Sequence, residues 1–211
     1  MSTILSYKIH TVTPYINWIY FFHAWGFQPR YAAIANIHGC DACRAMWLAS
    51  FPVEERNKAS EAMQLFKEAN RMLDVLDRDY EVRTIFKLCK ANSDGDNLVI
   101  EKAENQFMVF PLLRQQTPKK DGSPFLCLSD FIRPLSSGIP DTLGAFASSI
   151  DADMEGLYEQ DPYKHLLVQT LSDRLAEAAT EKMHEYVRKE AWGYAKDENL
   201  GMADLFCLLY T

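Results

Sequence analysis

The sequence predicts an α+β fold, and three observations predict it. Residues 82–150 contain short apolar segments separated by turn-forming residues, which is typical of strands. Residues 58–78 and 161–194 contain apolar residues at intervals of three and four, which is typical of helices that bury one face. A strand-rich middle with helices on both sides favours α+β organisation, here as a single domain over residues 1–211.

The first predicted helix is a short aromatic one over residues 12–27. Thr13 is a suitable N-cap, and Pro14 suits the first helical position. Aromatic residues gather on one side of this helix: Trp18, Phe21, Phe22 and Trp25. Because such side chains prefer the protein interior, we interpret this side as a core anchor, and a ligand-stacking face is the alternative.

Residues 28–57 contain a second helix around Cys43 that ends near Pro52, and they also contain a potential metal motif. Cys40 and Cys43 form a Cys-x-x-Cys pair, and His38 lies two residues before it. Two thiolates and an imidazole are zinc ligands, and His10, His23 or a distant cysteine would have to complete a structural site. The alternative is that these are cysteines at a helix start without metal. A thioredoxin-like function is not favoured, because no strand precedes the pair in a βαβ unit.

The next elements are the helix over residues 58–78 and an antiparallel set of strands. Strands are predicted over residues 83–91, 97–102, 106–113, 125–132 and 142–149. The polar segment between the first two predicts a hairpin, and Pro111 belongs at a strand end because it cannot donate to a ladder.

The last predicted element is a long amphipathic helix over residues 161–194. Asp161 is its expected N-cap and Pro162 its first residue. A helix of about thirty residues is about 45 Å long, so other elements must pack along it. Its polar face is expected to be solvated, with a favourable pair between Glu185 and Lys189. His184 is interpreted as a surface or packing residue.

Composition excludes several classes of function. The chain has 211 residues, 48% of them hydrophobic, with a net charge of −7 and a pI near 5.3. An acidic chain of this kind does not match a nucleic-acid binder, and no apolar run is long enough to span a membrane. The five cysteines, the others being Cys89, Cys127 and Cys207, and the absence of a signal-peptide pattern predict a reducing, cytoplasmic setting. We find no nucleophile elbow, dinucleotide fingerprint or phosphate-binding loop, and predict no catalytic residue.

Five segments, taken in order, carry a resemblance to a known family: INWIYFFHAW (16–25), LFKEANRMLD (65–74), LRQQTPKKDG (113–122), CLSDFIRPLSSGIPDTLGAFA (127–147) and DRLAEAATEKMHEYVRKEAWGYAKDENL (173–200). Together they resemble the C-terminal activation domain of cobalamin-dependent methionine synthase (5-methyltetrahydrofolate–homocysteine methyltransferase). The resemblance covers most of the chain, and the combination of these motifs is specific.

The resemblance implies helices packed on an antiparallel sheet, S-adenosylmethionine binding and a task in methionine biosynthesis. That task is the reductive remethylation of cob(II)alamin, with cobalamin held by a partner domain and the electron supplied by a flavodoxin-like reductase. From the composition, no nucleic-acid or membrane partner is expected. The resemblance also implies that this chain is not catalytic alone and mainly positions the methyl donor.

Three departures from the family pattern shape the expected site. The family's Ile-Asp-Trp reads Ile16-Asn17-Trp18, so Asn17 keeps a hydrogen-bonding group but not the charge. Residues 28–57 are an insertion, and the family therefore assigns no function to its Cys-x-x-Cys. The family continues into an Arg-Pro-Ala-x-Gly-Tyr-Pro loop around the ligand, whereas this sequence ends at an apolar segment, residues 205–211, before that loop. Either the reading frame is truncated at this point, or a partner protein covers the apolar end. We expect weaker S-adenosylmethionine binding without the loop.

Asn17 and Glu177, the latter within the Leu-Ala-Glu-Ala motif, are the predicted S-adenosylmethionine-binding residues. For Glu177, a solvated helix face is the alternative. Two other functional hypotheses stay open: a non-catalytic remnant or docking module with an incomplete ligand site, and a metal or redox module that uses His38, Cys40 and Cys43.

Overall fold

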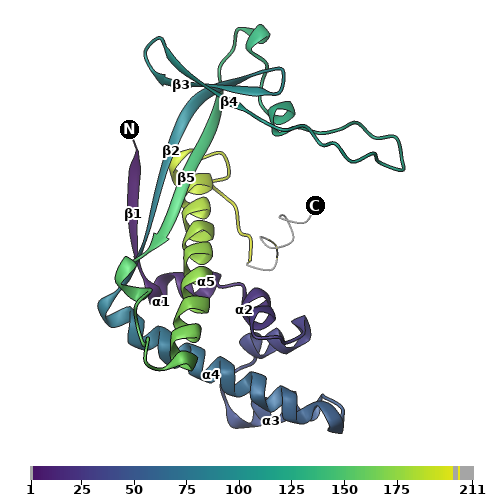
Figure 1. The fold of residues 1–211 in the computed structure, drawn as a ribbon, viewed down its shortest axis with the longest axis vertical. Coiled ribbons are helices and arrows are strands. Elements are labelled where there is room, and N and C mark those ends of the chain that lie inside the picture. Colours follow the sequence, from purple (N-terminus) through teal and green to yellow (C-terminus); the bar gives the residue numbers. More distant parts are fainter. Residues whose placement is uncertain (1, 202–203, 205–211) are drawn as a thin grey trace. The chain divides into compact units, whose positions relative to one another are not determined.

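The computed structural model describes residues 2–201 and 204, and it contains five named α-helices and five strands (Figure 1). The predicted apolar segment at residues 205–211 lies outside the described residues. The helices are α1 (Ile9–Val12), α2 (Trp18–Ala24), α3 (Asp41–Ala49), α4 (Arg56–Asp79) and α5 (Pro162–Tyr186). The strands are β1 (Thr3–Lys8), β2 (Glu81–Asp94), β3 (Asn97–Ala103), β4 (Gln106–Pro111) and β5 (Asp141–Ile150). None of these helices is both long and apolar enough to cross a bilayer.

Backbone contacts divide the chain into two compact units. One comprises residues 1–3 and 85–147, and the other comprises residues 4–84 and 148–211. The strand order is β1-β2-β3-β4, with β5 also paired to β2. β2 and β3 pair antiparallel, as do β3 and β4, with Asn92 opposite Val99 and Ile100 opposite Met108. The α+β prediction is therefore confirmed, while the single-domain prediction stays a prediction.

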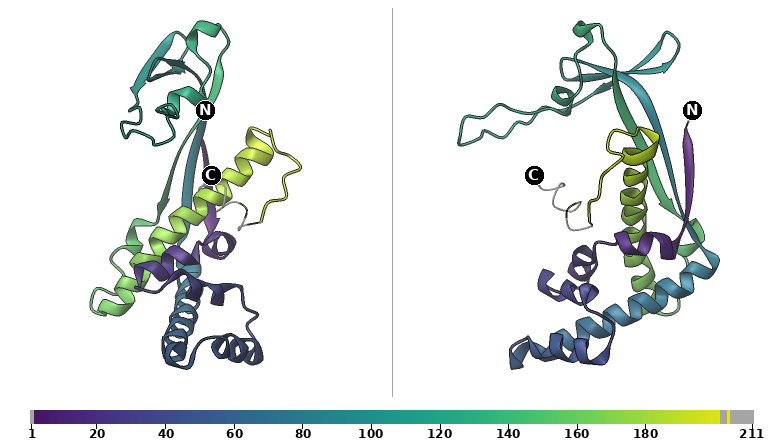
Figure 2. Two further views of the ribbon diagram at one scale, coloured as in Figure 1. Left: turned by 90° about the vertical axis from the view of Figure 1, so that its right-hand side faces the viewer. Right: turned by 180° about the vertical axis from the view of Figure 1, so that it is seen from behind.

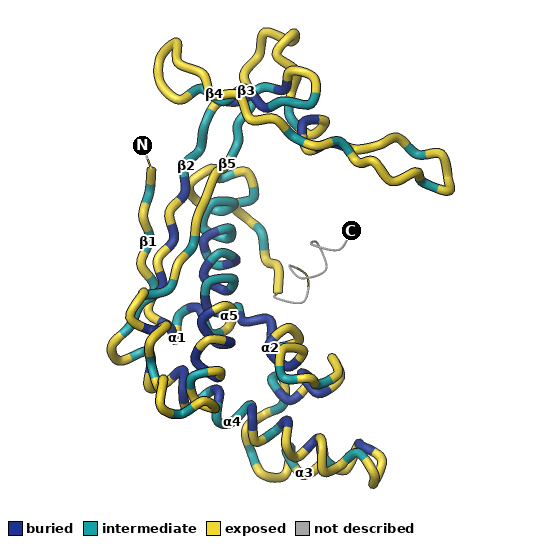
Figure 3. The backbone as a smooth tube through the Cα atoms, viewed as in Figure 1, coloured by how far each residue is buried: buried dark blue, intermediate teal, exposed yellow. Residues whose placement is uncertain are grey.

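The second unit contains a helical core built on α4 and α5, which contact each other and cross in both further views (Figure 2). The buried positions follow the inner faces of these helices (Figure 3). The predicted aromatic anchor is confirmed at its centre, because Phe21 and Phe22 are fully buried and Trp18 packs against Phe66. The buried apolar residues of α5 are Leu167, Val168, Leu171, Leu175, Ala178, Ala179 and Met183.

The start of α5 matches the prediction, and its end does not. Asp161 is the N-cap, and its carboxylate accepts the Lys164 backbone N–H at 3.1 Å, with Pro162 as the first helical residue. The α-helix ends at Tyr186 and continues as a π-helical turn over Val187–Ala191. Gly193 then takes a left-handed backbone conformation (φ +74°), which ends the helix before residue 194.

The first unit corrects one predicted strand. Residues 125–132 form no strand, and they contain a short 3₁₀ turn at Leu128–Phe131 instead. The Asp130 carboxylate accepts the Cys127 backbone N–H at 2.9 Å, which folds the segment back as a turn.

The strand β1 was not predicted at all, although its exposure alternates residue by residue.

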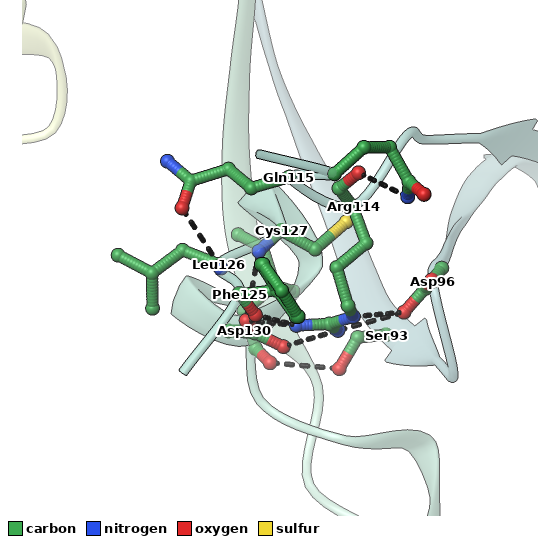
Figure 4. A network of polar contacts seen from close by, with 10 residues as sticks. Ser93, Asp96, Arg114, Gln115, Phe125, Leu126, Cys127 and Asp130 are labelled. Atoms are coloured by element: carbon green, nitrogen blue, oxygen red, sulfur yellow. Dashed lines mark hydrogen bonds and ion pairs between the residues drawn. The ribbon is translucent and has the colours of Figure 1, made fainter. Parts of the chain in front are cut away.

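Arg114, the second residue of LRQQTP, joins three segments of this unit (Figure 4). Its guanidinium donates to Asp96 at 2.7 Å, to Asp130 at 2.7 Å and to the Phe125 carbonyl at 2.7 Å. The guanidinium is the main cause that lowers the pKa of the Asp130 carboxyl to about 2. All three guanidinium nitrogens of Arg114 therefore donate hydrogen bonds within this unit and hold its loops together.

Candidate functional site

Asn17 begins α2, which corrects the predicted start of that helix. Its Oδ1 accepts the Ile19 backbone N–H at 3.1 Å, and the residue is buried with 6% exposure. Thr13 instead opens a 3₁₀ turn, Thr13–Tyr15, that precedes the helix. Thr13 and Asn17 are both good N-cap residues, and only the fold decides that the chain turns again before Trp18.

Glu177 lies on α5 and pairs with Arg174 one turn earlier. The Arg174 Nη1 donates to the Glu177 carboxylate at 2.7 Å. The same guanidinium lies over the ring of Tyr20 on α2, 5.7 Å from its centroid. A chain of contacts thus connects Glu177 through Arg174 to the first turn of α2, which Asn17 caps.

A groove of about 390 Å³ lies where α2 and α5 face each other. This volume is in the range that small-molecule sites use. Its walls are formed by Tyr20, His23, Ala24, Leu166, Gln169, Thr170, Asp173 and Arg174. A larger hollow of about 640 Å³ shares Gln169 and Asp173 with it and reaches the end of β5 at Ser148. The groove between the helices is our candidate site, because its lining residue Arg174 pairs with Glu177 and its lining residue Tyr20 lies in the first turn of α2, which Asn17 caps.

The groove offers a mixed set of recognition groups. Arg174 supplies a guanidinium group that can donate two hydrogen bonds to one carboxylate. Asp173 and Glu177 supply carboxylates close to it. Tyr20 supplies an aromatic face, which attracts cations and stacks on planar rings. Such a site suits a zwitterionic ligand that carries an aromatic part.

The structure brings the three potential metal ligands together, separately from the groove. Ligand atoms of His38, Cys40 and Cys43 lie within 4.8 Å of one another at the start of α3. Both cysteines are free and half-buried. The Cys43 thiol and the His38 ring beside it lower the pKa of the Cys40 thiol to about 7.

Comparison with known proteins identifies the family. The family model described as "Vitamin B12 dependent methionine synthase, activation domain" matches residues 8–211. The chain belongs to this family. A solved structure described as the MetH reactivation domain bound to AdoHcy is 34% identical and covers all of this chain, with a TM-score of 0.79. The chain covers 62% of that protein's chain, less than two thirds of its length.

The family assignment confirms the resemblance and the fold predicted from it. It supports the activation-domain hypothesis and neither the remnant nor the metal module as the function of the chain. In this activation domain, the family motif at residues 16–25 contains α2, and the motif at residues 173–200 contains the second half of α5 and the π-helical turn after it. These two motif segments border the candidate groove.

Glu181 of α5 behaves differently from the solvated face that the sequence predicts. Glu181 is buried with 9% exposure, and burial raises the pKa of its carboxyl group. The nearby Glu177 carboxylate acts in the same direction, and Arg188 opposes both. Burial likewise lowers the pKa of His184, which agrees with a packing residue. The spacing of the apolar stripe could have indicated Glu181, since it lies three residues after Ala178 and two before Met183.

Replacing Glu181 by Gln is expected to stabilise the domain at pH 7, with a gain that shrinks toward pH 4. The folded state holds the Glu181 proton to a higher pH than the unfolded chain does, so it binds more protons and loses stability as pH rises above about 4.3. Urea unfolding at both pH values measures this. Glu61→Gln, at an exposed position of α4, is the matched control. An equal effect at both pH values would contradict the prediction.

Proposed function

We propose that this activation domain binds S-adenosylmethionine in the groove between α2 and α5. The observation that carries the proposal is the contact chain from Tyr20 through Arg174 to Glu177, which starts in the groove at the helix that Asn17 caps. A relative of the same fold was solved in complex with AdoHcy, which differs from S-adenosylmethionine only by the sulfonium methyl group.

The groups around the groove fit this ligand. S-adenosylmethionine carries an ammonium, a carboxylate, a sulfonium and an adenine ring. Arg174 is suited to the carboxylate, and Glu177 with Asn17 is suited to the ammonium. Tyr20 presents a face for the adenine or the sulfonium. When bound, the ligand supplies an electrophilic methyl group, and these residues hold it in place.

We further propose that the domain acts in reactivation of cobalamin-dependent methionine synthase. The family assignment supports a cobalamin-binding domain of that enzyme as its partner. A flavodoxin-like reductase would supply the electron, and the domain would position the methyl donor. Four described cysteines are free thiols, which suits the cytoplasm as the site of this task.

Isothermal titration with S-adenosylmethionine tests the proposed site. We expect one saturable binding event, and we expect S-adenosylhomocysteine to compete for it. Methionine and adenosine, each given alone, should bind more weakly because each contacts only part of the groove. No heat with millimolar S-adenosylmethionine would overturn the proposal.

Restoring the family's carboxylate by Asn17→Asp is expected to tighten S-adenosylmethionine binding by about tenfold. A carboxylate adds a charge-assisted hydrogen bond to the ligand ammonium, worth about 1.4 kcal/mol for this change in affinity. Asp is as good an N-cap as Asn, so α2 should keep its start. Asn57→Asp, at an exposed position of α4, is the control for added charge. Equal tightening in both variants would show that net charge alone is responsible.

A further inference from the structure

Three ligand atoms of types that bind zinc converge at the start of α3, within residues 28–57. The Sγ atoms of Cys40 and Cys43 and a ring nitrogen of His38 lie within 4.8 Å of one another. In a tetrahedral site with Zn–S of about 2.3 Å and Zn–N of about 2.1 Å, neighbouring ligand atoms are about 3.5–3.8 Å apart. The observed spacing therefore needs only small side-chain rotations to close around an ion.

We propose that His38, Cys40 and Cys43 bind one Zn²⁺ ion whose fourth position is open to water or an external ligand. The donor set of two thiolates and one imidazole is characteristic of zinc and other thiophilic ions rather than of magnesium or calcium. Two thiolates also neutralise the charge of the ion. This site is separate from the proposed groove and goes beyond the proposed function.

The fourth position is open because the described part of the chain adds no further ligand to this group. The other two histidines that the sequence offered are used elsewhere: His10 pairs with Asp77 at 2.9 Å, and His23 lines the groove between α2 and α5. Three protein ligands with one free position are the arrangement of a reactive rather than a purely structural zinc site.

The local backbone favours this arrangement before any ion enters. Cys40 is the N-cap of the nine-residue helix α3, and its Sγ accepts the Cys43 backbone N–H at 3.3 Å. The helix start therefore holds the two sulfur atoms on one side, and its positive end stabilises thiolates. His38 is exposed and both cysteines are half-buried, so an ion reaches them from solvent.

The test uses the whole chain, reduced and purified without a histidine tag, with Zn²⁺ alone as the probe. Competition with a chromophoric chelator gives stoichiometry and affinity. We expect about one Zn²⁺ per chain, and His38→Ala, Cys40→Ser and Cys43→Ser should each weaken binding by more than about tenfold. Even substitutions of residues that only hydrogen-bond to a metal ligand typically lower metal affinity 10- to 100-fold. Cys89→Ser, which removes a half-buried thiol in β2, should leave the affinity unchanged.

Alkylation provides a second readout that does not depend on the variants. Zn²⁺ should slow iodoacetamide labelling of Cys40 and Cys43 in the wild-type chain, whereas labelling of Cys89 should not change. Unchanged labelling at all three positions would overturn the proposal. The same conclusion follows if the reduced protein binds no Zn²⁺ or if the ligand variants bind it as tightly as the wild type.

Discussion

Replacing Glu177 by Gln is expected to raise the dissociation constant for S-adenosylmethionine by about 10- to 100-fold. The substitution keeps the shape of the side chain and removes its charge, so the ligand ammonium loses an ionic hydrogen bond worth about 1.5–3 kcal/mol. Isothermal titration or competition with S-adenosylhomocysteine measures the change. Glu61→Gln removes a carboxylate from the exposed face of α4 and should not alter the affinity.

A structural effect of Glu177→Gln can be separated from a ligand effect. The ion pair with Arg174 leaves 36% of the Glu177 side chain exposed, so its loss should change stability little. Glu177→Asp keeps the charge on a shorter side chain and should lose less affinity than Glu177→Gln. If both variants bind like the wild type, Glu177 does not contact the ligand, and the solvated-face alternative holds.

Replacing Leu171 by Ala should lower the free energy of unfolding by about 2–5 kcal/mol. Leu171 is fully buried in the core of the second unit, and its truncation removes apolar contacts and leaves a cavity. Because native stability is only about 5–15 kcal/mol, this loss is a large fraction of it. Urea or thermal unfolding followed by circular dichroism measures the change.

The control for Leu171→Ala lies on the same helix. Leu166 is 50% exposed, so Leu166→Ala makes the same chemical change at a position that buries much less apolar surface. Its cost should be well below that of Leu171→Ala. Similar losses in the two variants would mean that the inner face of α5 is not the core contact described here.

The elements with strong periodicity were predicted well. α4 and the first part of α5 match because a long amphipathic stripe specifies both the helix and its buried face. The hairpin of β2 and β3 matches because a turn-forming segment lies between two apolar ones. These signals are local, so neighbouring residues are sufficient to produce them.

One of the errors arose where a distant residue contributes to the local structure. Residues 125–132 have the composition of a strand, but Asp130 turns the segment by accepting the Cys127 N–H and the Arg114 side chain. The end of α5 was placed too late because the predicted helix ran through Gly193, whose left-handed conformation ends it. That glycine is a local helix-end signal, so this boundary could have been predicted from the sequence.

The sequence by itself determined the fold class, the core faces of the long helices and the family, because periodicity and motif order are properties of the chain alone. It also indicated Asn17 and Glu177 as individual residues. Only the tertiary structure connected Glu177, through Arg174, to Tyr20 of the helix that Asn17 caps, since the packing of α2 on α5 joins positions more than 150 residues apart. The burial of Glu181 and the convergence of His38 with Cys40 and Cys43 likewise depend on packing and side-chain direction, which spacing along the chain does not fix.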